Sequence, residues 1–154
     1  MTGVFFQVVI QGLSRSTLNA LLDFIYTGGI RVTQDNVQDL LIGSDMIQVQ
    51  EVVDLCTRFL LDQLDPTNAI GMYRFAVGHN FMRLRESTMD FVYKNFPAVS
   101  QEEEFKELPK DILCQILDSE LLCIDSEYQV TLKPCVLAHK CDTNRIFLRD
   151  LSFI

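Results

Sequence analysis

Residues 64–78 read LDPTNAIGMYRFAVG, and this stretch carries a strong helix-start signal. Asp65 is a preferred capping residue, and Pro66 suits a first helical position because the amide hydrogen that proline lacks has no partner there. Ile70, Tyr73 and Val77 then follow at helical spacing up to Gly78. The stretch therefore predicts a helix that begins at Asp65-Pro66.

A second helix is predicted upstream, between residues 14 and 28. Ser14 or Ser16 can cap its start, and Gly28-Gly29 can end it in a left-handed conformation. Its apolar positions follow the i, i+3, i+4, i+7, i+8 pattern of an amphipathic helix, namely Leu18, Leu21, Leu22, Ile25 and Tyr26. Residues 6–10 instead alternate with period two, which predicts one short strand.

The same periodicity predicts helices through most of the chain up to residue 117. We expect Gly43 to weaken the end of the helix that contains it. A capping box of Ser100 and Glu103 is expected to open a short acidic helix, and Pro97 and Pro109 mark helix boundaries. The sequence shows no exact internal repeat. The fold class indicated is mainly α.

Composition and charge exclude several classes of protein. The chain has 154 residues, 48% of them hydrophobic, with a formal net charge of −8. This composition argues against disorder, and the acidic balance argues against nucleic-acid binding. No apolar run approaches the about 20 residues that a membrane helix needs. Five scattered cysteines and the absence of a signal-peptide pattern favour a reducing, cytoplasmic location, with the nucleus as the alternative.

The last 24 residues differ from the rest. Residues 131–154 carry four basic and two acidic side chains, whereas residues 1–130 carry nine basic and nineteen acidic ones. Pro134 also interrupts any helix begun at Ser126. We expect residues 131–154 to form a divergent tail.

No residue cluster indicates a metal or cofactor site. Cys135, His139 and Cys141 are zinc-ligand types, with Cys123 as the nearest fourth, but their spacing is irregular, so free thiols are the preferred interpretation. Cys56 lies on an apolar helical face and is expected to be a buried structural thiol.

No residue cluster indicates catalysis either. His79 could be a base, but a capping role near a helix end is preferred. The acidic residues that open a helix are expected to form a solvated face, favoured by the helix dipole; they are Glu102, Glu103, Glu104, Glu107 and Asp111. Gly28-Gly29 is a cap and not a phosphate loop, and no nucleophile–base motif is present. These features predict an interaction module that is not an enzyme.

Several segments, in order, resemble one family. QVVIQGLS (7–14), LLDFIYTG (21–28) and VTQDNVQDLL (32–41) are similar to the second half of a BTB/POZ domain of the kelch-like family. Later matches resemble its post-BTB helix pair and BACK domain: LDPTN (64–68), Gly71, Phe75-Ala76, His79, EEF (103–105), Leu108-Pro109 and IDSE (124–127).

The resemblance implies a domain order and a function. Residues 1–64 would be a partial BTB/POZ fold of one strand plus helices, and residues 65–130 a post-BTB helix pair with a truncated BACK-type helical array. The implied function is a substrate-specific adaptor of a cullin-3 RING ubiquitin ligase that also self-associates. The implied cullin surface lies on a helix pair over residues 65–81, with contacts from Asn68, Met72, Phe75, Ala76 and His79.

Two alternatives stay open: a fragment of a BTB-containing transcriptional regulator, and a truncated isoform that is non-functional or inhibitory. The family's first BTB half and its kelch repeats have no counterpart in these 154 residues. We therefore expect cullin binding at least tenfold weaker than that of a complete BTB domain, and irregular self-association through an unpaired strand and an exposed apolar stripe. The sequence does not indicate the substrate.

Overall fold

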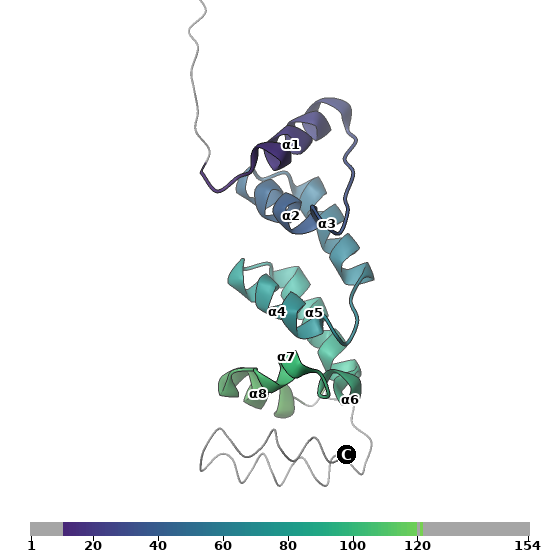
Figure 1. Cartoon of the computed structure of the whole chain (residues 1–154), viewed down its shortest axis with the longest axis vertical. Helices are drawn as coiled ribbons and strands as arrows, with labels where there is room; N and C mark the ends of the chain where they lie inside the picture. The colour runs from purple at the N-terminus through teal and green to yellow at the C-terminus, as the bar shows by residue number, and fades with distance from the viewer. Residues whose placement is uncertain (1–10, 120, 122–154) are drawn as a thin grey trace, which may run out of the picture. The chain divides into compact units, whose positions relative to one another are not determined.

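The computed structural model describes residues 11–119 and 121. The chain divides into two compact units, Met1–Asp62 and Gln63–Ile154. Every element assigned in the described part is a helix (Figure 1). This confirms the mainly helical fold class, whereas the strand predicted over residues 6–10 lies outside the described residues.

Within the described residues, the first unit contains α1 (Arg15–Thr27), α2 (Val37–Met46) and α3 (Gln50–Asp62). The predicted ends of α1 are confirmed. Ser14 Oγ accepts a hydrogen bond from the Thr17 amide at 3.1 Å, and Gly28 has a left-handed φ of 72° with its amide donated to the Phe24 carbonyl. Local capping chemistry therefore fixes both ends of this helix.

The apolar stripe predicted along α1 is only partly buried. Leu21 is fully buried and Leu18 is half-buried. Leu22, Ile25 and Tyr26 are exposed, and Tyr26 retains 86% of its accessible surface. An exposed stripe favours association, but the predicted self-association itself remains a prediction.

Gly43 lies where α1 and α2 meet. α2 continues through it to Met46, and the residue is buried. A Cβ atom at this position would come within 2.5 Å of Leu13 Cδ1 and 2.8 Å of Thr17 Cγ2. The glycine therefore allows a close approach of the two helices, a role that its sequence position did not suggest.

The second unit contains α4 (Ala69–Gly78), α5 (Met82–Lys94), α6 (Phe96–Val99), α7 (Glu103–Lys106) and α8 (Lys110–Leu117) among its described residues. The predicted helix start at Asp65-Pro66 is wrong by about one turn. Asp65 Oδ1 accepts from the Thr67 hydroxyl at 2.6 Å and from the Thr67 amide at 2.8 Å. These bonds hold the segment in a turn, because a short aspartate side chain can satisfy the amides that follow it.

The predicted helix pair over residues 65–81 also needs correction. That segment holds a single helix, α4, and the helix that packs against it is α5. The capping box of Ser100 and Glu103 is wrong as well. Ser100 Oγ donates to the Pro97 carbonyl at 3.1 Å, and Glu102, the residue before α7, makes no side-chain cap.

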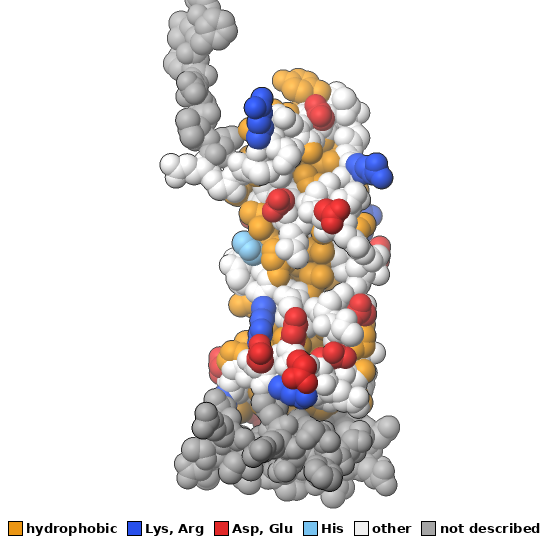
Figure 2. Space-filling view, viewed as in Figure 1, with side chains coloured by type: hydrophobic (Ala, Val, Ile, Leu, Met, Phe, Trp, Pro, Cys, Tyr) orange, Lys and Arg blue, Asp and Glu red, His pale blue; other side chains and the backbone are white. Residues whose placement is uncertain are grey.

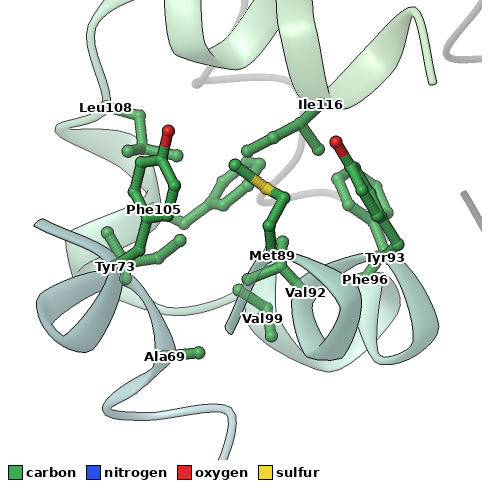
Figure 3. Close-up of a cluster of buried hydrophobic side chains, with 11 residues drawn as sticks. Ala69, Tyr73, Met89, Val92, Tyr93, Phe96, Val99, Phe105, Leu108 and Ile116 are labelled. Carbon is green, nitrogen blue, oxygen red and sulfur yellow. The ribbon is translucent and has the colours of Figure 1, made fainter. Parts of the chain in front are cut away.

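A buried apolar cluster holds the second unit together. Figure 3 shows side chains from α4 through α8 converging on it, with the Phe96 and Phe105 rings edge to face at 5.6 Å. Aromatic pairs in this geometry are stabilising beyond the area that they bury. The members of the buried apolar cluster are Ala69, Ile70, Tyr73, Met89, Val92, Tyr93, Phe96, Val99, Phe105, Leu108 and Ile116.

The hairpins α2–α3 and α4–α5 begin in the same way, although the sequence shows no exact repeat. Asn36 precedes α2 and Asn68 precedes α4, 32 positions later. Each amide oxygen accepts from the backbone three residues earlier, at 2.8 Å from Thr33 and 3.0 Å from Asp65. Each amide nitrogen donates to the carbonyl five residues earlier.

The two hairpins also turn in the same way. Gln48 and Asn80 follow the first helices with φ of 60° and 59°. In each hairpin this residue donates to the carbonyl three before it, and the next residue donates to the carbonyl five before itself. This is the Schellman arrangement, which satisfies carbonyls at a helix end. The chain therefore repeats one helical hairpin with a period of 32 residues.

Candidate functional site

Three of the five residues implied as partner contacts share one face of α4. Met72, Phe75 and His79 are spaced i, i+3 and i+7, so they lie in a row along the helix. Met72 and Phe75 are half-buried, and His79 is exposed at the helix end. We call this row the α4 surface.

The other two implied contacts are placed differently. Ala76 is fully buried. The Asn68 side-chain amide is engaged within its own turn, since its nitrogen donates to the Gln63 carbonyl at 2.7 Å and to Asp65 Oδ2 at 3.3 Å. Ala76 therefore supports α4 from within, and Asn68 fixes the turn that precedes the helix.

An aromatic cluster joins the α4 surface to the start of α5. The Phe75 and His79 rings have centroids 4.9 Å apart. Phe81, the residue before α5, lies 5.8 Å from Phe75 and stacks on His79 at 5.9 Å. Phe81 is buried whereas His79 is exposed, so Phe81 forms the base of the cluster.

Phe81 was not identified from the sequence. The available signal was an apolar residue three positions after the end of α4, because an apolar residue after a left-handed helix cap commonly packs back on the helix. His79 does lie at the end of a helix, as expected, and its amide donates to the Phe75 carbonyl at 3.1 Å. Its ring, however, contributes to an aromatic surface.

Charged groups flank α4 on another side. Arg74 donates to the Glu107 carbonyl at 3.1 Å, and its guanidinium lies 3.9 Å from the Glu107 carboxylate. A Cβ atom at Gly71 would meet Glu104 Oε2 at 3.1 Å. These contacts place α7 against α4 at Gly71 and Arg74, beside the α4 surface.

Four of the five acidic residues predicted to form a solvated face are exposed, whereas Glu102 is half-buried. Glu103, Glu104, Glu107 and Asp111 are exposed, and Figure 2 shows acidic side chains gathered over this part of the second unit. Lys106 Nζ pairs with Glu103 Oε1 at 2.7 Å. Negative charge near helix starts is favoured by the helix dipole, so these residues have a structural explanation.

Among the described residues, no group of three or more His, Cys, Asp or Glu side chains could hold a metal ion. Cys123, Cys135, His139 and Cys141 lie outside those residues, so the absence of a zinc site there remains a prediction. Cys56 is buried as predicted, and burial raises the pKa of its thiol to about 11. No helix in residues 11–119 has the length and apolar character that a membrane span requires.

Two family models together match most of the chain. Residues 4–64 match the family model described as BTB/POZ domain, and residues 69–142 match the one described as BACK, BTB And C-terminal Kelch.

Three curated relatives have names that contain the word kelch. Kelch-like protein 24 of Homo sapiens is 38% identical over 123 residues, 80% of this chain and 20% of the relative. Kelch-like protein 24a of Danio rerio is 36% identical over 146 residues, 94% of this chain and 24% of the relative. Kelch repeat and BTB domain-containing protein 8 of Danio rerio is 36% identical over 124 residues, 80% of this chain and 21% of the relative. The chain thus spans about a fifth to a quarter of the length of these proteins.

Proposed function

Because the chain belongs to the BTB–BACK proteins of the kelch-like family, we propose that it acts as a substrate-specific adaptor of a cullin-3 RING ubiquitin ligase. In this role it performs no chemistry of its own. It holds a substrate lysine near the ubiquitin-charged enzyme, and it accelerates transfer by raising the local concentration of the two reactants. The proposal places the protein in the cytoplasm, and includes self-association through the BTB region.

The observation that carries the proposal within this structure is the α4 surface. It presents a thioether, a phenyl ring and an imidazole in a row, and the rings contact each other and Phe81. Aromatic side chains that are already held in place lose little conformational entropy on binding, and they dominate the energetics of many interfaces. The surface lies in the segment that resembles the family's post-BTB region, where a cullin contact is implied.

Burial and side-chain hydrogen bonding together decide which residues the proposal relies on. Met72, Phe75 and His79 present accessible atoms, whereas Ala76 has none. We therefore assign direct contact to the first three. Asn68 and Ala76 support the surface, Asn68 by fixing the turn before α4 and Ala76 by allowing close packing beneath it.

A binding titration with the N-terminal domain of cullin-3 tests this proposal on the full chain. Phe75→Ala and His79→Ala should each weaken binding by about tenfold or more, as expected for residues at the centre of an interface. Val77→Ala is the matched control, because Val77 is an exposed apolar residue on α4 about 200° around the helix from Phe75. It should leave the affinity within about twofold.

Two results would count against the proposal. No binding by the unsubstituted chain at high micromolar cullin-3 would reject the adaptor function. Full binding by both Phe75→Ala and His79→Ala would keep the function and reject the α4 surface as the contact. Circular dichroism of each variant confirms that the helices remain folded, and light scattering over a range of concentrations tests self-association.

A further inference from the structure

We infer that Asn80 is a positioning residue for the α4 surface: its left-handed backbone closes α4 and places Phe81 against Phe75 and His79. This inference rests on the proposed function for its binding consequence. Its structural part stands on the geometry of the turn alone.

The turn between α4 and α5 depends on one residue with positive φ. Asn80 has φ of 59°, its amide donates to the Val77 carbonyl at 3.2 Å, and the Phe81 amide donates to the Ala76 carbonyl at 2.9 Å. Gly78 is two positions earlier and could adopt such a conformation at no steric cost, yet it does not have positive φ. The reversal therefore occurs at Asn80, two residues after the last residue of α4.

Asparagine suits this position better than most residues with a side chain. Its short polar side chain tolerates the left-handed region, where a branched Cβ clashes with the neighbouring backbone. Glycine is the other residue that commonly closes helices in this way. The position should therefore accept glycine and reject a β-branched residue.

The position of the turn determines where the next aromatic side chain lies. Once the Phe81 amide is bonded to the Ala76 carbonyl, the Phe81 ring is brought back over the last turn of α4. There it lies 5.8 Å from Phe75 and 5.9 Å from His79, and it is buried. The exposed His79 imidazole then packs on a ring whose position the turn fixes. The backbone conformation of Asn80 therefore controls the orientation of the His79 side chain, although Asn80 itself touches no binding partner.

The first hairpin supplies an internal control. Gln48 has φ of 60° and the same pair of hydrogen bonds in the turn between α2 and α3. The residues that flank it are Ile47 and Val49, and they correspond to His79 and Phe81. Both hairpins therefore contain the same turn, and of the two, only the turn between α4 and α5 positions aromatic rings.

Three substitutions in the full chain test the inference: Asn80→Gly, Asn80→Val and Gln48→Val. The first readout is the NMR chemical shift of the His79 ring protons, which the adjacent Phe75 and Phe81 rings displace. The second is affinity for the cullin-3 N-terminal domain. Asn80→Gly should retain both, with affinity within about twofold. Asn80→Val should move the His79 signals toward random-coil values and weaken binding by about tenfold or more.

Gln48→Val separates positioning from general destabilisation. It introduces the same backbone conflict in the other hairpin, so it should lower the unfolding temperature while leaving the His79 signals unchanged and the affinity within about twofold. If Asn80→Val does not fold, Asn80→Ala takes its place as a milder conflict at the same position.

The inference is overturned if Asn80→Val, or Asn80→Ala in its place, leaves the His79 signals unchanged, or if Gln48→Val shifts them equally. Absence of cullin-3 binding by the unsubstituted chain would reject the proposed function alone, because the NMR readout reports the arrangement of the rings without any partner.

Discussion

Replacing Gly43 by alanine sets two known effects against each other. Alanine is favoured over glycine inside a helix by about 1 kcal/mol, so the substitution would stabilise α2 if space were available. The added Cβ would instead meet Leu13 Cδ1 at 2.5 Å, Thr17 Cγ2 at 2.8 Å and Leu21 Cδ1 at 3.2 Å. Separations below 3.0 Å require the neighbours to move.

The neighbours differ in how readily they can yield. Leu13 is half-buried and lies before α1, so its terminal methyl can rotate away. Thr17 is buried within α1 and is β-branched, so its χ1 angle has little freedom. Overpacking of this kind costs about 1–3 kcal/mol, which exceeds the helix-propensity gain. We therefore expect Gly43→Ala to destabilise the first unit by about 1 kcal/mol.

Gly78→Ala is the matched control. Gly78 is the last residue of α4, its φ lies outside the left-handed region, and a Cβ atom there would meet nothing within 4 Å. This substitution should be neutral or stabilise by up to about 1 kcal/mol. The free energy of unfolding should therefore fall in Gly43→Ala and stay unchanged or rise in Gly78→Ala.

Urea unfolding followed by circular dichroism measures both variants, and hydrogen exchange in α1 and α2 assigns the Gly43 effect to the first unit. Adding Thr17→Ser to Gly43→Ala removes the methyl at 2.8 Å while keeping a hydroxyl that can bond to Ser14, so it should restore part of the loss. If Gly43→Ala were as stabilising as Gly78→Ala, the close approach of α1 and α2 would not be the reason for the glycine.

Three further outcomes are expected. Thr88→Val should stabilise the second unit by about 1 kcal/mol in urea unfolding, because Thr88 Oγ1 is buried without a hydrogen-bond partner; a loss of stability would indicate a hidden partner. Cys56 should resist alkylation at pH 8 until denaturant is added, since the thiol is buried and its pKa is about 11; peptide mapping by mass spectrometry measures this, and rapid labelling in the native protein would contradict it. Hydrogen bonds from the Thr67 hydroxyl and amide lower the pKa of Asp65, so its contribution to stability is present at neutral pH and is lost as the pH falls below about 4. Thermal unfolding of Asp65→Ala should therefore differ from that of the unsubstituted chain at pH 7, and the difference should become smaller as the pH falls toward 3; a constant difference would exclude this linkage.

Features that depend on neighbours within one or two helical turns could be predicted from the sequence. The ends of α1 follow from Ser14 and Gly28, and α8 begins after Pro109, because capping requires only residues a few positions apart. The acidic face of α7 and α8 follows from the same local chemistry. The order of short motifs also sufficed to indicate the kelch-like family.

Features that depend on segments far apart in the sequence, or on competition between local options, followed only from the packing of the helices. Asp65 looked like a helix cap, but its carboxylate instead holds a turn that delays α4 to Ala69. Gly43 looked like a weak helix end until α1 was placed against it. Asn80, rather than Gly78, takes the left-handed conformation. Periodicity predicts the apolar positions of a helix but not which of them a neighbouring element covers. Only the packed structure therefore distinguishes Ala76, which is buried, from Phe75 and His79, which form an accessible cluster with Phe81.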